Sequence, residues 1–152
     1  MGASKITYYS RAENDYQFIK GNYEEGRVSE VMCYVMQSIC ERYLKHIIDT
    51  CCTEDAGSVM RTHTIRNLRD FIMEFIPDFN CDWSVALKVD GYYFSARYPG
   101  DDAILVKADD VQSCWEATNV VRDAVQDYLS NIEHQAGTGD FPDSVVNKLN
   151  SF

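Results

Sequence analysis

The chain has 152 residues, 45% of them hydrophobic and 25% charged, with a formal net charge of −10 at pH 7. This length and composition predict one soluble globular domain. The acidic balance disfavours loose binding to polyphosphate, so we expect no autonomous DNA binding. No apolar run approaches the roughly 20 residues that cross a bilayer, and the N-terminal MGASKITYYS lacks the apolar core of a secretory signal. We therefore expect a cytoplasmic protein with no membrane association.

The first 51 residues predict two amphipathic helices. The second is the longer, and we expect it to run from about Glu24 to Cys51, with an apolar stripe that begins at Val28. Gly21-Asn22 and Gly26 lie in the expected connection between the two helices. The first helix places these residues on one face: Tyr9, Ala12, Tyr16, Ile19 and Tyr23.

Three further helices are predicted in the remainder of the chain. The third, THTIRNLRDFIMEFIPDF, ends at Pro77, and the fourth, WSVALKVDGYYFSARYPG, is weakened by Asp90-Gly91. The fifth starts at a capping-box-like Asp109-x-x-Gln112. The fold class is therefore all-α, an antiparallel bundle of about five helices over residues 1–135. We expect residues 136–152 to form a flexible tail with one short helix after Pro142.

The six cysteines are predicted to be reduced and structural. They form no C-x-x-C pair and have no nearby histidine, so neither a metal site nor a cofactor is expected. The adjacent Cys51-Cys52 pair is the one place where oxidation would be checked first. The paired aspartates at 101–102 and 109–110 lack the spacing of a calcium loop and are expected to be solvated.

Three fragments, in order, resemble motifs of the HEPN domain (higher eukaryotes and prokaryotes nucleotide-binding) of bacterial type. They are CERYLKHII at 40–48, RTHTIRNL at 61–68 and YYFSARYPGDD at 92–102, and the resemblance covers roughly residues 5–135. It implies a bundle of four or five helices that commonly forms a homodimer and binds a nucleotide. Some members of this family are ribonucleases, and many are encoded beside a small nucleotidyltransferase as a toxin–antitoxin pair.

The catalytic motif of the family's ribonucleases, an arginine and a histidine on a helix with four to six residues between them, is absent. None of the three histidines has the required arginine, and in the last helix Arg122 is followed six residues later by Tyr128. The nearest approach is Arg42 with His46, which share a helix face and could meet a phosphate in a metal-independent ribonuclease of the toxin type. The alternative is a solvated, exposed face, on which Glu41 and Asp49 would repel a phosphate.

A ligand site is predicted at the start of the third helix. There His63 lies among Arg61, Arg66 and Arg69, and free backbone N–H groups attract anions. A guanidinium fork and an aromatic ring from the 92–102 turn would suit a phosphate and a base. The alternative is a structural network, with Thr62 or His63 capping the helix and Arg97 paired to Glu41 or another carboxylate inside the bundle. The predicted ligand-binding residues are His63, Arg66, Arg97, Tyr98, Glu41 and Lys45.

Three interpretations of function follow. The first is a non-catalytic HEPN-like module that dimerises and binds a nucleotide phosphate or a partner protein, for example a small nucleotidyltransferase. The second is the ribonuclease toxin, and the third is a purely structural helical protein. Dimerisation is also suggested by Tyr34, Trp115 and Val120, which make the apolar surface wider than one bundle face needs.

Overall fold

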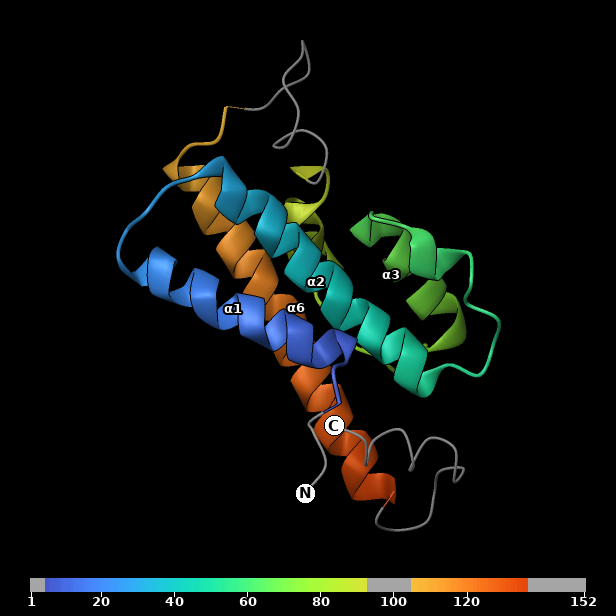
Figure 1. Ribbon diagram of the computed structural model, residues 1–152. Coiled ribbons are helices and arrows are strands. Elements are labelled where there is room, and N and C mark those ends of the chain that lie inside the picture. The colour runs from blue at the N-terminus through green and yellow to red at the C-terminus, as the bar shows by residue number, and fades with distance from the viewer. Residues whose placement is uncertain (1–4, 93–104, 137–152) are drawn as a thin grey trace.

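The computed structural model describes residues 5–92 and 105–136, and the account below is confined to them (Figure 1). These residues form α-helices and two short 3-10 helices, and no β-strand occurs among them. The all-α bundle that the sequence predicts is confirmed. The helices are α1 (Tyr8–Glu24), α2 (Glu30–Cys51), α3 (Ile65–Phe75), α4 (Trp83–Ala86) and α6 (Ala108–Ala136), with 3-10 helices at Val59–Arg61 and Leu87–Val89.

The centre of the bundle consists of α1, α2 and α6, with α3 on the side of α2 away from α1 (Figure 1). Two contacts show that α1 runs antiparallel to α6. Tyr16, near the middle of α1, donates to Asn119 at 2.5 Å. Tyr9, in the first turn of α1, accepts from Gln126, which lies later in α6, at 3.0 Å. The helices α2 and α6 run in the same general direction (Figure 1). Residues 52–107 therefore return the chain from the end of α2 to the start of α6.

The core is built around α2, which is contacted by α1, α3 and α6 and is buried on several sides. A helix at the centre of a bundle cannot expose a full polar face, so α2 buries more residues than the predicted apolar stripe contains. The apolar face expected for α1 is confirmed. The largest fully buried side chains of α2 are Met36, Gln37, Ile39, Tyr43, Leu44, Ile47 and Ile48.

The second helix begins at Glu30, not at the expected Glu24. The helix α1 continues through Glu24, and the chain then turns at Gly26, whose φ of 76° favours glycine. Ser29 is the N-cap of α2, and its hydroxyl accepts a hydrogen bond from the Val31 N–H at 3.2 Å. The apolar pattern missed this boundary because it continues through the turn.

The fourth helix predicted over residues 83–100 is present only in part among the described residues, because it is interrupted at Asp90-Gly91, where the sequence indicated a weakness. The four residues of α4 are followed by a 3-10 turn, and the chain leaves helical geometry at Asp90 and at Gly91, where φ is 92°. Residues 93–100 lie outside the described residues. The capping box at Asp109 is wrong, because α6 begins at Ala108 and Asp110 accepts the Lys107 N–H at 2.9 Å. The expected tail, apart from Ala136 at the end of α6, is likewise not described.

Trp115 does not form surplus surface as expected. Its indole stacks on Tyr16 and Tyr23 of α1, with ring centroids 5.2 and 5.0 Å apart. Trp115 therefore contributes to packing between α1 and α6 within one chain. Tyr34 and Val120 are likewise only partly exposed.

All six cysteines are free thiols, as predicted, and Cys33, Cys40 and Cys114 are fully buried. Burial raises the pKa of Cys40 to about 12. Thiols of this kind behave as small apolar side chains. Within the described ranges, no helix is both long enough and apolar enough to cross a membrane.

Candidate functional site

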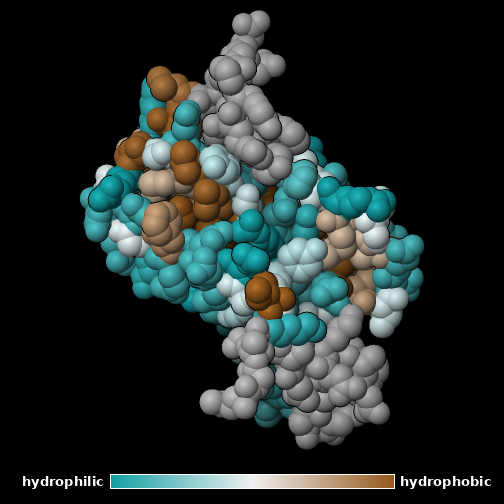
Figure 2. Space-filling view, viewed as in Figure 1, coloured by the Kyte–Doolittle hydropathy of each residue, from teal (hydrophilic) through white to brown (hydrophobic). Residues whose placement is uncertain are grey.

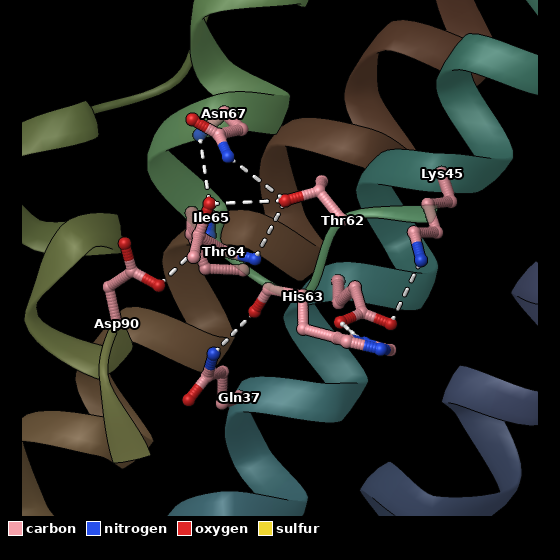
Figure 3. A network of polar contacts seen from close by, with 9 residues as sticks. Gln37, Lys45, Thr62, His63, Thr64, Ile65, Asn67 and Asp90 are labelled. Carbon is pink, nitrogen blue, oxygen red and sulfur yellow. Dashed lines mark hydrogen bonds and ion pairs between the residues drawn. The ribbon is translucent and has the colours of Figure 1, made fainter. Parts of the chain in front are cut away.

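Three polar residues on α2 follow one another at four-residue intervals: Gln37, Glu41 and Lys45. This spacing places them on one face of the helix. All three are buried, which is rare for charged side chains without partners. They face the loop between α2 and α3, from which His63 extends toward them (Figure 3). We call these four residues the His63 network.

The His63 network fixes both the backbone and the ring of His63. The Gln37 side-chain amide donates to the His63 carbonyl at 2.7 Å, and the Glu41 carboxylate lies 3.1 Å from His63 Nδ1. The second oxygen of Glu41 accepts a hydrogen bond from Lys45 Nζ at 3.1 Å. The His63 side chain nevertheless remains 42% exposed, whereas that of Glu41 is 11% exposed. Buried polar groups therefore hold a histidine ring that solvent can reach.

The backbone N–H groups at the start of α3 are not free, contrary to the prediction. The Asp90 carboxylate accepts from Ile65 N–H at 2.9 Å and from Arg66 N–H at 3.2 Å. Thr64 is the N-cap residue, and its hydroxyl accepts from the Asn67 N–H at 3.4 Å (Figure 3). The cap is therefore neither Thr62 nor His63. An anion placed at these amides would meet the negative charge of Asp90.

The structure brings together three of the six predicted ligand-binding residues: Glu41, Lys45 and His63. Arg66 lies in the first turn of α3, three residues after His63 in the chain, and is exposed. Arg97 and Tyr98 lie outside the described residues.

Arg42 and His46 do not form the solvated face that was expected as the alternative to catalysis. His46 is only 4% exposed, and its ring centroid lies 5.5 Å from that of Tyr9. Burial lowers the pKa of His46 to about 4, although the nearby Asp49 charge opposes the shift. Arg42 forms an ion pair with Asp15 of α1. At pH 7 this histidine is a neutral ring, able to accept a proton but not to act as a cationic acid.

Arg42 and His46 also line a groove between α1 and the C-terminal half of α2, with a volume of about 690 Å³. This size is within the range of small-ligand pockets. The sequence pattern did not reveal the groove, because six of its ten lining residues come from positions 5–15, which are distant from α2 in the sequence. The remaining lining residues are Lys5, Ile6, Thr7, Tyr8, Arg11, Asp15, Asp49 and Thr50.

Arg122 of α6 is held inside the bundle by Glu13 of α1. Its Nε and Nη2 atoms donate to the Glu13 carboxylate at 2.8 and 3.2 Å, and the guanidinium carbon lies 4.2 Å from the centroid of the Tyr16 ring. Burial raises the pKa of Glu13, but hydrogen bonds from Arg122 and Tyr43 outweigh it and keep that pKa below its usual value. Tyr128 is also engaged, because its hydroxyl donates to Asp78 at 3.1 Å.

Sequence reasoning missed Gln37 and Asp90. A signal for Gln37 was present, since Gln37, Glu41 and Lys45 form a polar row at the edge of an apolar stripe. No local signal marks Asp90 as a cap for a helix that begins 25 residues earlier. In the part of the chain that the structure describes, no group of three or more His, Cys, Asp or Glu residues is arranged to hold a metal ion.

Comparison with protein-family models identifies the HEPN domain over residues 7–128. This match covers α1, α2, α3, α4 and most of α6, so it includes the His63 network and every lining residue of the groove except Lys5 and Ile6. Searches of the curated proteins and of the solved structures found no match to the chain. The family match spans most of the chain and agrees with the helical bundle. The chain therefore belongs to the HEPN domain family.

Proposed function

We propose that the chain is a non-catalytic, cytoplasmic binding module that holds the phosphate of a nucleotide beside His63. The observation that carries this proposal is the His63 network. Burying a charged or polar side chain costs free energy unless it gains partners. Three such side chains on α2 are used here to fix one loop whose histidine ring faces solvent. Such support is typical of a site that must be held in one geometry for a ligand.

The donors of the proposed site are side chains. Lys45 carries three N–H donors, and Glu41 accepts from one of them. His63 contributes an imidazole, and Arg66 contributes an exposed guanidinium at the start of α3. The proposal also assigns Arg97 and Tyr98, from the family's turn, to the same site as phosphate and base contacts. Since Asp90 occupies the α3 amides, the phosphate would bind on the side of Lys45 and His63.

A binding role is favoured over catalysis because the family's arginine–histidine motif is absent. Arg122 and Tyr128, which occupy the last helix where that motif usually lies, are committed to Glu13 and Asp78. The second candidate is a metal-independent ribonuclease using Arg42 and His46. It is favoured by one observation, namely that both residues line the groove between α1 and α2.

We further propose that the module forms a homodimer. Val28, Val31 and Leu105 are exposed by 50%, 50% and 79% at the end of the bundle where α2 and α6 begin. Figure 2 shows hydrophobic atoms gathered at this end. A two-fold contact between two copies would remove this surface from water. A small nucleotidyltransferase is the alternative occupant, and a mixed complex would distinguish it from a second copy.

Thermal unfolding with and without ATP tests the binding proposal. At one hundred times the dissociation constant, a ligand specific for the folded chain stabilises it by about 2.7 kcal/mol. For this chain length we expect the Tm to rise by about 5–10 °C. His63→Gln should abolish the rise, whereas His134→Gln, an exposed histidine near the end of α6, should leave it intact. An unchanged Tm in the wild type, or an equal rise in both variants, would contradict the proposal.

Light scattering tests the dimer. At micromolar concentration we expect about twice the 17.4 kDa of one chain. The double substitution Val28→Glu and Val31→Glu should restore the mass of a monomer, because it places like charges in the contact. A wild-type mass of 17.4 kDa would exclude the dimer.

A further inference from the structure

The groove between α1 and α2 lies on a different face of α2 from the His63 network. Its walls are formed by residues at four-residue spacing on two antiparallel helices, with Thr7, Arg11 and Asp15 on one side and Arg42, His46 and Thr50 on the other. Helix pairs usually close such a seam with apolar side chains. Here the positions that face each other are polar or charged, so the groove of about 690 Å³ has a mixed lining in which polar groups and apolar surface both take part.

The groove lining carries a small excess of positive charge, although the chain as a whole carries a net charge of −10. The lining has three cations and two carboxylates, and Asp15 is already paired with Arg42. Neither Lys5 nor Arg11 has a carboxylate within ion-pair distance among the described residues. Both side chains are exposed, so they can turn toward a bound anion.

The floor of the groove contains a buried imidazole. His46 is 4% exposed, and its Nε2 atom lies 3.4 Å from the Thr50 hydroxyl, which is also buried. A neutral histidine and a hydroxyl offer hydrogen bonds to a ligand without adding charge. At the rim, Ile6 and Tyr8 are 67% and 38% exposed and offer apolar contact. The groove thus combines cationic donors, a polar floor and an apolar rim.

We infer that this groove is a second binding site. Its ligand is a small organic molecule that has a flat apolar body and one oxyanion group, either a phosphate or a carboxylate. Arg11 and Lys5 bind the oxyanion, with the guanidinium fork of Arg11 giving paired charge-assisted hydrogen bonds. His46 and Thr50 provide hydrogen bonds at the floor, and Tyr8 and Ile6 pack on the apolar body. The capping box of Thr7 and Ser10 already satisfies backbone groups at the start of α1, so side chains hold the anion.

Phenyl phosphate and benzoate are suitable probes, because each joins an oxyanion to a flat ring. Each is titrated into the full chain, and amide resonances are followed by NMR. We expect saturable shifts confined to residues 5–15 and 42–50. Arg11→Gln should weaken binding by about tenfold or more, because it removes a charge-assisted bidentate contact. Tighter binding of phenyl phosphate would assign a phosphate ligand, and tighter binding of benzoate a carboxylate.

Arg27→Gln is the matched control, since it removes the same charge at an exposed position in the turn between α1 and α2. It should leave the affinity unchanged. Absence of saturable shifts with both probes would overturn the second site, as would equal weakening by Arg11→Gln and Arg27→Gln. Shifts at residues 61–67 with none at residues 5–15 would also overturn it, while leaving the proposal for His63 intact.

Discussion

Glu13 of α1 accepts two hydrogen bonds from the guanidinium of Arg122 in α6, at 2.8 and 3.2 Å. The same carboxylate accepts a third, from the fully buried Tyr43 of α2 at 2.5 Å. One carboxylate therefore joins the three central helices. The partners of Glu13 include a cation and a buried hydroxyl. Removal of either partner would leave polar groups in the bundle without a hydrogen bond.

Arg122→Ala should lower the free energy of unfolding by about 2–3 kcal/mol, somewhat less than the 3–5 kcal/mol typical of a fully buried pair. The expected loss is smaller than for a fully buried pair because the side chains of Arg122 and Glu13 are 21% and 25% exposed. Arg27→Ala, which breaks an exposed pair with Glu25, should cost less than about 1 kcal/mol. Urea unfolding measures both. Equal losses would show that Arg122 is not structurally coupled to Glu13.

His46 should make stability fall with acidification. Its pKa is lowered from 6.5 to about 4 by burial, so below pH 6.5 the unfolded chain binds a proton that the folded chain excludes. The contribution is fully present above the unfolded pKa and is lost as pH falls toward 4. Between pH 7 and pH 5, the wild type should lose about 2 kcal/mol more than His46→Gln. Urea unfolding at the two pH values gives this difference, and parallel losses would contradict a buried neutral His46.

The thiols should divide into two kinetic classes. Cys33, Cys40 and Cys114 are fully buried, whereas Cys51, Cys52 and Cys81 are partly exposed, and burial raises the pKa of Cys81 to about 12. Reaction with a thiol reagent requires the thiolate and access. In the folded protein we expect Cys51 and Cys52 to react first, and in denaturant without reductant all six should be counted. A count below six would reveal a disulfide.

Asp90 should stabilise the N-terminus of α3, although it lies far from this helix in the sequence. Asp90→Ala removes the acceptor of the Ile65 and Arg66 N–H groups and should cost about 1–2 kcal/mol, as the loss of a helix cap does. Asp109→Ala removes an exposed acid from the first turn of α6 and should cost only about 0.3–1 kcal/mol. Thermal or urea unfolding compares them. A smaller loss for Asp90→Ala than for Asp109→Ala would refute its role as a cap.

Much of the fold could be predicted because burial of one helix face imposes a three- and four-residue spacing on apolar residues. This spacing identified α1, α2, α3 and α6. It could not reveal that His46 is buried, because α2 contacts helices on several sides and its polar positions are covered by Tyr9 and Asp15 of α1.

The candidate site was predicted only in part, for a related reason. Glu41, Lys45 and His63 were among the predicted ligand-binding residues, and the structure brings these three together. The contacts that fix it join positions 22 and 26 residues apart, as between Gln37 and His63. Local spacing carries no information about such contacts, so the support from Gln37 and the cap from Asp90 emerged only from the packed chain.

Isothermal titration of ATP into the full chain tests most directly the claim that buried residues of α2 hold His63 for a ligand. We predict saturable binding with one ATP per chain, weakened about tenfold or more by His63→Gln. Gln37→Leu removes the donor to the His63 carbonyl and should weaken binding while the helical circular-dichroism spectrum is retained. An absence of saturable binding, or an affinity unchanged by His63→Gln, would contradict the account.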